Sequence, residues 1–140
     1  MKFLTIKYMR KIIAITLMLF SFTFVLNAQT QWYRTTAFAQ ASVNYGIYTW
    51  GNWENSNMRM CIDWDRGFIA IYSPTMQKYA ITKYISKWTD SDGAEQTKFQ
   101  AIDADGDVCT IRFRIPLSGK SQLYINFSNI AWVYNVVKSN

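Results

Sequence analysis

Apolar and polar side chains alternate along most of the chain after residue 28. The clearest case is the segment 109–115, in which Cys109, Ile111, Phe113 and Ile115 oppose Thr110, Arg112 and Arg114. A period of two places successive side chains on opposite faces of a β-strand, one dry and one wet. The pattern therefore predicts a half-buried strand here. No segment after residue 28 has the sustained period of an amphipathic helix.

Shorter runs with the same period recur, separated by clusters of Gly, Pro, Asp and Ser that favour turns. Besides 109–115, we expect strands over residues 32–41, 58–64, 68–73, 77–88, 97–101, 122–127 and 132–136. The segment 43–53 is ambiguous because Gly46 and Gly51 interrupt it. About seven or eight short strands joined by tight turns predict an all-β fold. We expect a single antiparallel meander that forms a small barrel or a sandwich.

The first 28 residues have a different pattern, that of a cleavable signal peptide. Four basic residues come first, namely Lys2, Lys7, Arg10 and Lys11, and an uncharged run of 15 residues follows at 12–26. A membrane-spanning helix needs about 20 apolar residues, so this run is short for an uncleaved anchor, which is the alternative. We expect residues 1–28 to be removed and residues 29–140 to form a single all-β domain. That domain would be exported, periplasmic or extracellular, without stable membrane insertion.

The amino-acid composition excludes several kinds of catalytic and metal-binding site. The chain has no histidine, which excludes Ser-His-Asp and Cys-His catalysis and zinc sites built on histidine. It also has no glycine-rich phosphate loop, and we expect neither a cofactor nor enzymatic activity. Loss of residues 1–28 removes four of the 15 basic residues and none of the 9 acidic ones, so the net charge falls from +6 to 11 − 9 = +2. We therefore do not expect a nucleic-acid partner.

An acidic motif at residues 103–107 has a functional and a structural interpretation. Asp103, Asp105 and Asp107 are alternate carboxylates, a pattern that can supply hard oxygen ligands to calcium. In an EF-hand loop, however, Gly stands sixth and Glu twelfth, whereas here Gly106 is fourth and Arg114 is twelfth. The mismatch favours a hairpin turn, in which Asp and Gly satisfy the backbone, and no metal site is predicted.

A second acidic motif is formed by Asp63 and Asp65, which flank Trp64. Paired carboxylates can act as the acid and base of glycoside hydrolysis. This pair runs into a turn beside Arg66, and solvated turn charges are the favoured interpretation.

The two cysteines, Cys61 and Cys109, can form a disulfide in an oxidising compartment. Alternation assigns Cys109 to the apolar face of its strand, whereas Cys61 falls on the polar face with Arg59 and Asp63. Cysteines on opposite faces of one sheet do not meet the Cβ separation of about 4 Å that a disulfide needs. A bulge or a second sheet would remove this objection. The sequence leaves both a disulfide and two buried thiols open.

Aromatic residues provide the remaining positive signal. Trp50 and Trp53 stand in TWGNWEN (49–55), a stretch too polar and too broken by Gly51 for an ordinary core strand. An exposed aromatic pair is a candidate platform for stacking on a ligand. The alternative, which we favour at this point, is that both rings plug one end of the barrel.

Three segments resemble a group of small secreted proteins of unknown function from gut bacteria and their phages. They are IAIYSPTMQKY at 69–79, DADGDVCTIR at 103–112, and 122–135 with QLYINF and WVYN. The resemblance covers most of the chain after Trp50. It implies a small secreted β-domain and no particular activity or site.

Two hypotheses about function follow. The first is a non-enzymatic binding module whose partner is a glycan, a small apolar ligand or a protein, with Trp50 and Trp53 as its candidate residues. A lipocalin-like cavity is one version of it, opposed by the bulk of the aromatic side chains. The second is a secreted inhibitor or structural component that acts through a loop or an open sheet edge.

Overall fold

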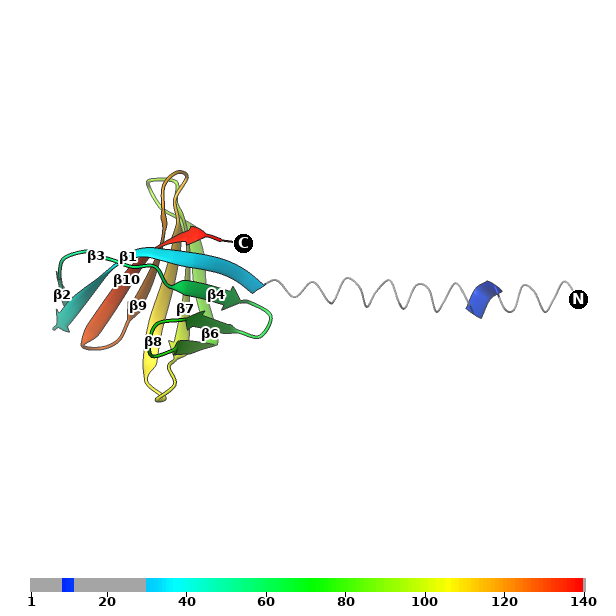
Figure 1. Cartoon of the computed structure of the whole chain (residues 1–140), viewed down its shortest axis with the longest axis horizontal. Coiled ribbons are helices and arrows are strands. Elements are labelled where there is room, and N and C mark those ends of the chain that lie inside the picture. Colours follow the sequence, from blue (N-terminus) through cyan, green and yellow to red (C-terminus); the bar gives the residue numbers. More distant parts are fainter. Residues whose placement is uncertain (1–8, 12–29, 140) are drawn as a thin grey trace, which may run out of the picture.

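The computed structural model describes residues 9–11 and 30–139 of the chain (Figure 1). The predicted signal peptide therefore lies outside the described residues, apart from the short helical segment Met9–Lys11. No helix within the described part of the chain is long and apolar enough to cross a membrane.

The described part of the chain folds almost entirely into strands. They are β1 (Thr30–Asn44), β2 (Ile47–Trp50), β3 (Glu54–Asn55), β4 (Arg59–Asp63), β5 (Phe68–Ile71), β6 (Gln77–Thr89), β7 (Glu95–Ile102), β8 (Val108–Ile115), β9 (Ser121–Asn126) and β10 (Ile130–Lys138). The predicted all-β class is confirmed, and the ambiguous segment 43–53 contains the end of β1 and all of β2.

Eight of these strands form a closed antiparallel barrel, with β2 and β3 as two additional strands. From β4 to β10 each strand pairs with the next in the chain, and β1 closes the circle by pairing with both β4 and β10 (Figure 1). The fold is thus the barrel form of the predicted meander and not a sandwich. Three strands pair with successive parts of one edge of β1. β4 pairs with Thr30–Arg34, and β3 and β2 pair with the residues that follow.

The barrel interior is filled by side chains from all eight wall strands. The fully or almost fully buried set is Tyr33, Met60, Ile62, Ile69, Ile71, Tyr79, Phe99, Ala101, Cys109, Ile111, Phe113, Leu123, Ile125, Tyr134 and Val136. The alternation predicted for the strands at 109–115, 122–127 and 132–136 is confirmed for most positions, since their apolar residues supply much of this set. Ile115 is the exception, because it lies at the end of its strand and is 43% exposed. Burial of large aliphatic and aromatic side chains stabilises the barrel by about 1.5–3 kcal/mol each.

Alternation fails along the second half of β6. The sequence places Ile85 on the same face as Tyr79 and Ile81, but Ile85 is 45% exposed. The pairing of β6 with β7 shifts register twice, between Ile81 and Lys83 and between Tyr84 and Ser86. Each bulge adds a residue and reverses the faces of those that follow, so simple alternation cannot be extended across them.

A two-residue turn joins β1 to β2. Asn44 pairs with Ile47, and the residues between them, Tyr45 and Gly46, have φ angles of 50° and 76°. Positive φ at both positions is the type I′ turn that matches the twist of a hairpin. Gly46 adopts it without strain, whereas Tyr45 does so at a cost and is fully exposed, so it gains no packing in return.

Replacement of Tyr45 by asparagine should raise the free energy of unfolding by about 1 kcal/mol, because asparagine tolerates the left-handed region that tyrosine resists. Urea unfolding followed by tryptophan fluorescence measures the change. Tyr45→Ala is the matched control and should give no comparable gain, since alanine also has a Cβ. Equal stabilisation by both variants would contradict the strain argument.

Candidate ligand-binding site

The outer wall of the barrel carries two rows of side chains, one running from β7 to β1 and the other from β8 to β2. Cross-strand pairing aligns the first row as Lys98, Arg112, Tyr124, Val133 and Ala39. It aligns the second as Thr110, Asn126, Ala131, Ala41 and Trp50. These residues alternate with core residues along their strands, so they point away from the barrel interior.

On β10 and β1 both rows consist of small, apolar and buried residues. Ala39, Ala41, Ala131 and Val133 are each at most 3% exposed although they lie on the outer wall. The hairpin strand β2 and the segment that follows it bring larger rings to this region, with Trp50 paired directly to Ala41. The small side chains therefore form the floor of a depression that aromatic rings border.

Three adjoining depressions follow the two rows. The first, about 310 Å³, is lined by Ala39, Trp50, Gly51, Trp53, Tyr124 and Val133. The second, about 410 Å³, is lined by Tyr48, Trp50, Arg112, Tyr124 and Asn126. The third, about 360 Å³, is lined by Tyr48, Lys98, Val108, Cys109, Thr110, Arg112, Asn126, Phe127 and Ser128. Because neighbouring depressions share residues, they form one continuous surface, which we call the outer groove.

Aromatic contacts hold the walls of the outer groove. The rings of Tyr48 and Trp50 lie nearly parallel, with centroids 6.2 Å apart, and Trp50 meets Tyr124 edge-on at 6.4 Å. The guanidinium carbon of Arg112 lies 3.9 Å from the centroid of the Tyr124 ring. Tyr48 and Trp50 are still 44% and 42% exposed, so much of their ring surface remains available to a ligand.

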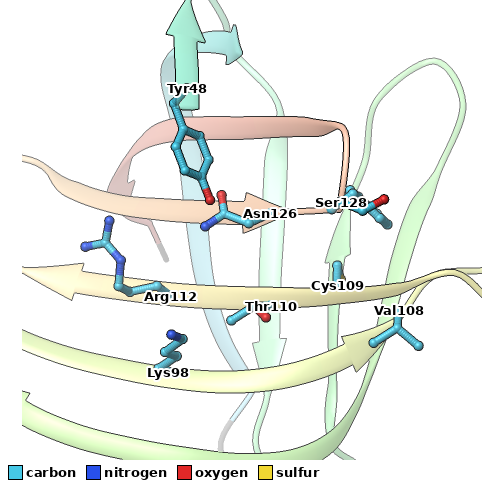
Figure 2. Close-up of a pocket in the computed structure, with 9 residues that line it drawn as sticks. Tyr48, Lys98, Val108, Cys109, Thr110, Arg112, Asn126 and Ser128 are labelled. Carbon is cyan, nitrogen blue, oxygen red and sulfur yellow. The ribbon is translucent and has the colours of Figure 1, made fainter. Parts of the chain in front are cut away.

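A polar atom in the groove lacks a partner. The Oδ1 atom of Asn126 is buried and accepts no hydrogen bond within the described part of the protein. In Figure 2 the side chain of Tyr48 points from β2 toward Asn126, with Arg112 and Thr110 on the neighbouring strand. A buried acceptor without a donor is costly, so Asn126 is a polar residue in the wall of the groove that the protein itself leaves unsatisfied.

The cationic part of the groove is positioned by a hydrogen-bonded network on the same wall. The Arg112 guanidinium donates to the Gln96 side chain, which donates to Asp90 at 2.8 Å. Arg114 also donates to Asp90, at 3.2 Å. Desolvation acts to raise the pKa of Asp90, but hydrogen bonds from the Ala94 amide, Gln96 and Arg114 outweigh it and lower that pKa.

The structure places both predicted tryptophans on the outer wall. Trp50 lines two of the depressions, and Trp53, 50% exposed, lines the one over Ala39 and Val133. The expectation that both rings plug one end of the barrel is therefore wrong. β2 pairs with the outer part of β1 and directs its side chains over the wall, whereas core residues from the eight wall strands fill the interior.

Sequence reasoning missed Tyr48, Tyr124, Arg112, Asn126 and Lys98 as site residues. Alternation already puts several of them on wet faces, where they are indistinguishable from ordinary surface residues. One indirect sequence signal for the site was available, namely the recurrence of alanine and valine at outward positions of β1 and β10. Small apolar residues at such positions indicate that something covers them.

The two cysteines are both free and buried. Cys109 belongs to the core set, whereas Cys61 pairs across strands with Trp32 and Ala70, which are outside that set. The facing argument is confirmed, since the thiols lie on opposite faces of the wall. Desolvation, with a smaller contribution from Asp103, raises the pKa of Cys109 to about 11, so this thiol is protonated at neutral pH.

The acidic motifs have structural roles. The Asp103 carboxylate accepts hydrogen bonds from the amides of Asp105 and Asp107, at 3.0 and 2.8 Å, as expected for a turn. Asp63 accepts from the Arg66 amide at 2.8 Å and caps the turn after β4. Its interpretation as a solvated charge is wrong, because Asp63 is only 3% exposed, with the Thr30 hydroxyl beside its second oxygen.

A further open depression of about 540 Å³ is lined by Asp103, Asp107 and Trp132 and meets the third depression of the outer groove at Val108, Phe127 and Ser128. Asp103 is occupied by its own turn, and no unpartnered buried polar atom is recorded among the described residues lining this depression. It therefore gives a weaker indication of a ligand than the outer groove.

No protein-family model, curated protein or solved structure matches this chain. The function must therefore be argued from the geometry of the outer groove.

The cysteines should titrate as two free thiols per chain after unfolding without reductant, and neither should react quickly in the native protein, since both are buried. A colorimetric thiol assay with and without denaturant measures this. Cys109→Ala is the control and should reduce the count to one. A wild-type count near zero after unfolding would show a disulfide and contradict the structure.

The Asp90 network predicts a specific acid sensitivity. A lowered folded-state pKa means that Asp90 stabilises the fold above its unfolded pKa, about 3.9, and that this contribution disappears as the pH falls through the folded value. The stability difference between pH 7 and pH 3, measured by urea unfolding, should therefore be smaller in Asp90→Asn. Glu54→Gln, which removes an exposed carboxyl outside the network, should keep the wild-type difference. An unchanged difference in Asp90→Asn would contradict this assignment.

Proposed function

We propose that this protein is an exported, non-enzymatic binding module that holds a saccharide in the outer groove. The observation that supports this most directly is the placement of exposed Tyr48 and Trp50 rings beside the unpartnered Oδ1 atom of Asn126. Export rests on the signal peptide predicted at residues 1–28.

A saccharide suits this surface better than a wholly apolar ligand. Sugar rings have C–H faces that pack on aromatic rings and hydroxyl groups that both donate and accept hydrogen bonds. The groove offers both kinds of partner, namely the rings of Tyr48, Trp50 and Tyr124 and the polar side chains of Thr110 and Asn126. A lipocalin-like ligand would instead need space among the interior side chains, which are packed as the core.

The groove offers little for catalysis. Its lining residues include no carboxylate that could act as a general acid or base. The Cys109 thiol lies in the core with a raised pKa. Asp63 and Asp103 are engaged in their own turns. A binding role therefore fits these residues better than a hydrolytic one.

The second candidate function is strand pairing with a protein partner along β6. Residues 82–89 of β6 pair with β7 and have no strand on their other edge within the described part of the chain. Tyr84, Ile85 and Trp88 are exposed there. Two bulges and the lysines Lys83 and Lys87 interrupt this edge, and both features discourage strand addition. We therefore favour the outer groove.

The test is a screen of immobilised oligosaccharides, followed by calorimetric titration of those that bind. Trp50→Ala should weaken binding by about tenfold, since it removes an exposed stacking face worth about 1.4 kcal/mol. Trp88→Ala is the matched control, because it removes an exposed tryptophan outside the groove, and should bind as wild type. Folded Trp50→Ala and Tyr48→Ala variants that both keep affinity within twofold would refute the proposed site.

A further inference from the structure

We infer that the saccharide bound in the outer groove is anionic, with a carboxylate or sulfate group that binds to Arg112 and Lys98. This inference rests on the proposed function and adds the chemical class of the ligand. Both cations line the same depression, and none of the residues lining the three depressions of the outer groove is acidic. Asp103 and Asp107 line a separate depression, which meets the cationic one at Val108, Phe127 and Ser128.

Three carboxylates at the turn between β6 and β7 are paired with other cations, whereas Asp103 and Asp107 line the adjoining depression and belong to its turn. Asp90 and Asp92 lie 3.2 and 3.6 Å from the Arg114 guanidinium, and Glu95 lies 4.0 Å from Lys87. No ion pair of Lys98 or Arg112 with a carboxylate is recorded within the described part of the chain. The groove therefore has two positive charges that the protein itself leaves uncompensated.

The arrangement of these charges is unfavourable without a ligand. Lys98 and Arg112 are direct cross-strand partners on adjacent strands β7 and β8. Like charges in such positions repel and destabilise a sheet. An anion bound between Lys98 and Arg112 would replace that repulsion with two attractive contacts. Figure 2 shows both side chains on the same part of the wall as Thr110 and Asn126.

Arg112 is positioned in advance for such an anion. Gln96 accepts from its Nη1 atom, Gln96 is anchored by Asp90, and the ring of Tyr124 lies against the guanidinium. A guanidinium has five N–H donors, and most remain available for the oxygens of a carboxylate or sulfate. A side chain fixed before binding loses less entropy when the ligand arrives.

Lys98 and the two tryptophans lie at opposite ends of the first row, since Trp50 and Trp53 border the depression over Ala39. From Lys98 on β7 to Ala39 on β1 the first row crosses four interstrand steps, roughly 19 Å at about 4.8 Å per step. The charged ring of an oligosaccharide would lie at the β7–β8 end, and its other rings would reach Trp50 and Trp53. This geometry fits an extended chain of rings better than a single compact anion.

Calorimetric titration of the full mature protein with four probes tests the inference. The probes are tetragalacturonate, its fully methyl-esterified neutral form, a sulfated tetrasaccharide and inorganic sulfate. Tetragalacturonate or the sulfated probe should bind about tenfold tighter than the neutral ester, and added salt should weaken only the anionic probes. Whichever of the two binds more tightly identifies the anionic group.

Variants separate this inference from the proposed function. Arg112→Gln should weaken binding of the anionic probes about tenfold more than binding of the neutral ester, so that the preference for anions disappears, whereas Trp50→Ala should weaken both kinds of probe to a similar extent. Lys120→Gln removes an exposed charge outside the groove and should behave as wild type. Neutral and anionic probes that bind equally, or equal effects of Arg112→Gln and Lys120→Gln, would overturn the inference alone. Failure of every saccharide to bind would overturn the proposed function as well. If inorganic sulfate bound as tightly as the saccharides, the site would be a simple anion site and the inference of an anionic saccharide would be wrong.

Discussion

The pairing of β1 with four other strands is the constraint on which the rest of the structure depends. Its nine aligned pairs with β10 close the barrel, and its opposite edge is divided among β4, β3 and β2. The pairing of β1 with β10 has a bulge between Thr35 and Ala37. At the same position along β1, the opposite edge changes its partner from β4 to β3. Thr35 is buried there and bonds to Ser56 and to the amide of Met58, which ties the intervening segment to the wall.

This division of one edge also creates the candidate site. Because β4 ends its pairing at Arg34, the rest of β1 is free to hold a short strand that carries Tyr48 and Trp50. The small residues of β1 and β10 let those rings approach Tyr124 across the wall. Closure of the barrel and formation of the outer groove therefore have a common origin, although the interior and the groove share few side chains.

The fold was largely predictable from the sequence, whereas the site was predictable only in part. Alternation identified most core residues of β8, β9 and β10, because one face of each strand is buried along most of its length. It failed at Ile85, where bulges in β6 change the faces. Trp50 and Trp53 were recognised as candidates, but their position was not, since nothing local indicates that β2 follows the outer edge of β1. Asn126 and Arg112 acquire their significance only from residues that pairing brings beside them.

The central claim is that ligands bind on the outer wall between β2 and β8–β9, and not inside the barrel or along β6. Amide chemical-shift mapping by NMR during titration with a saccharide that binds tests this most directly. The account predicts that the largest shifts fall on residues 47–53, 110–112 and 124–128, with the core amides of β4 and β5 unchanged. Shifts concentrated on residues 82–89 of β6, or on the wall strands β4 and β5, would contradict it.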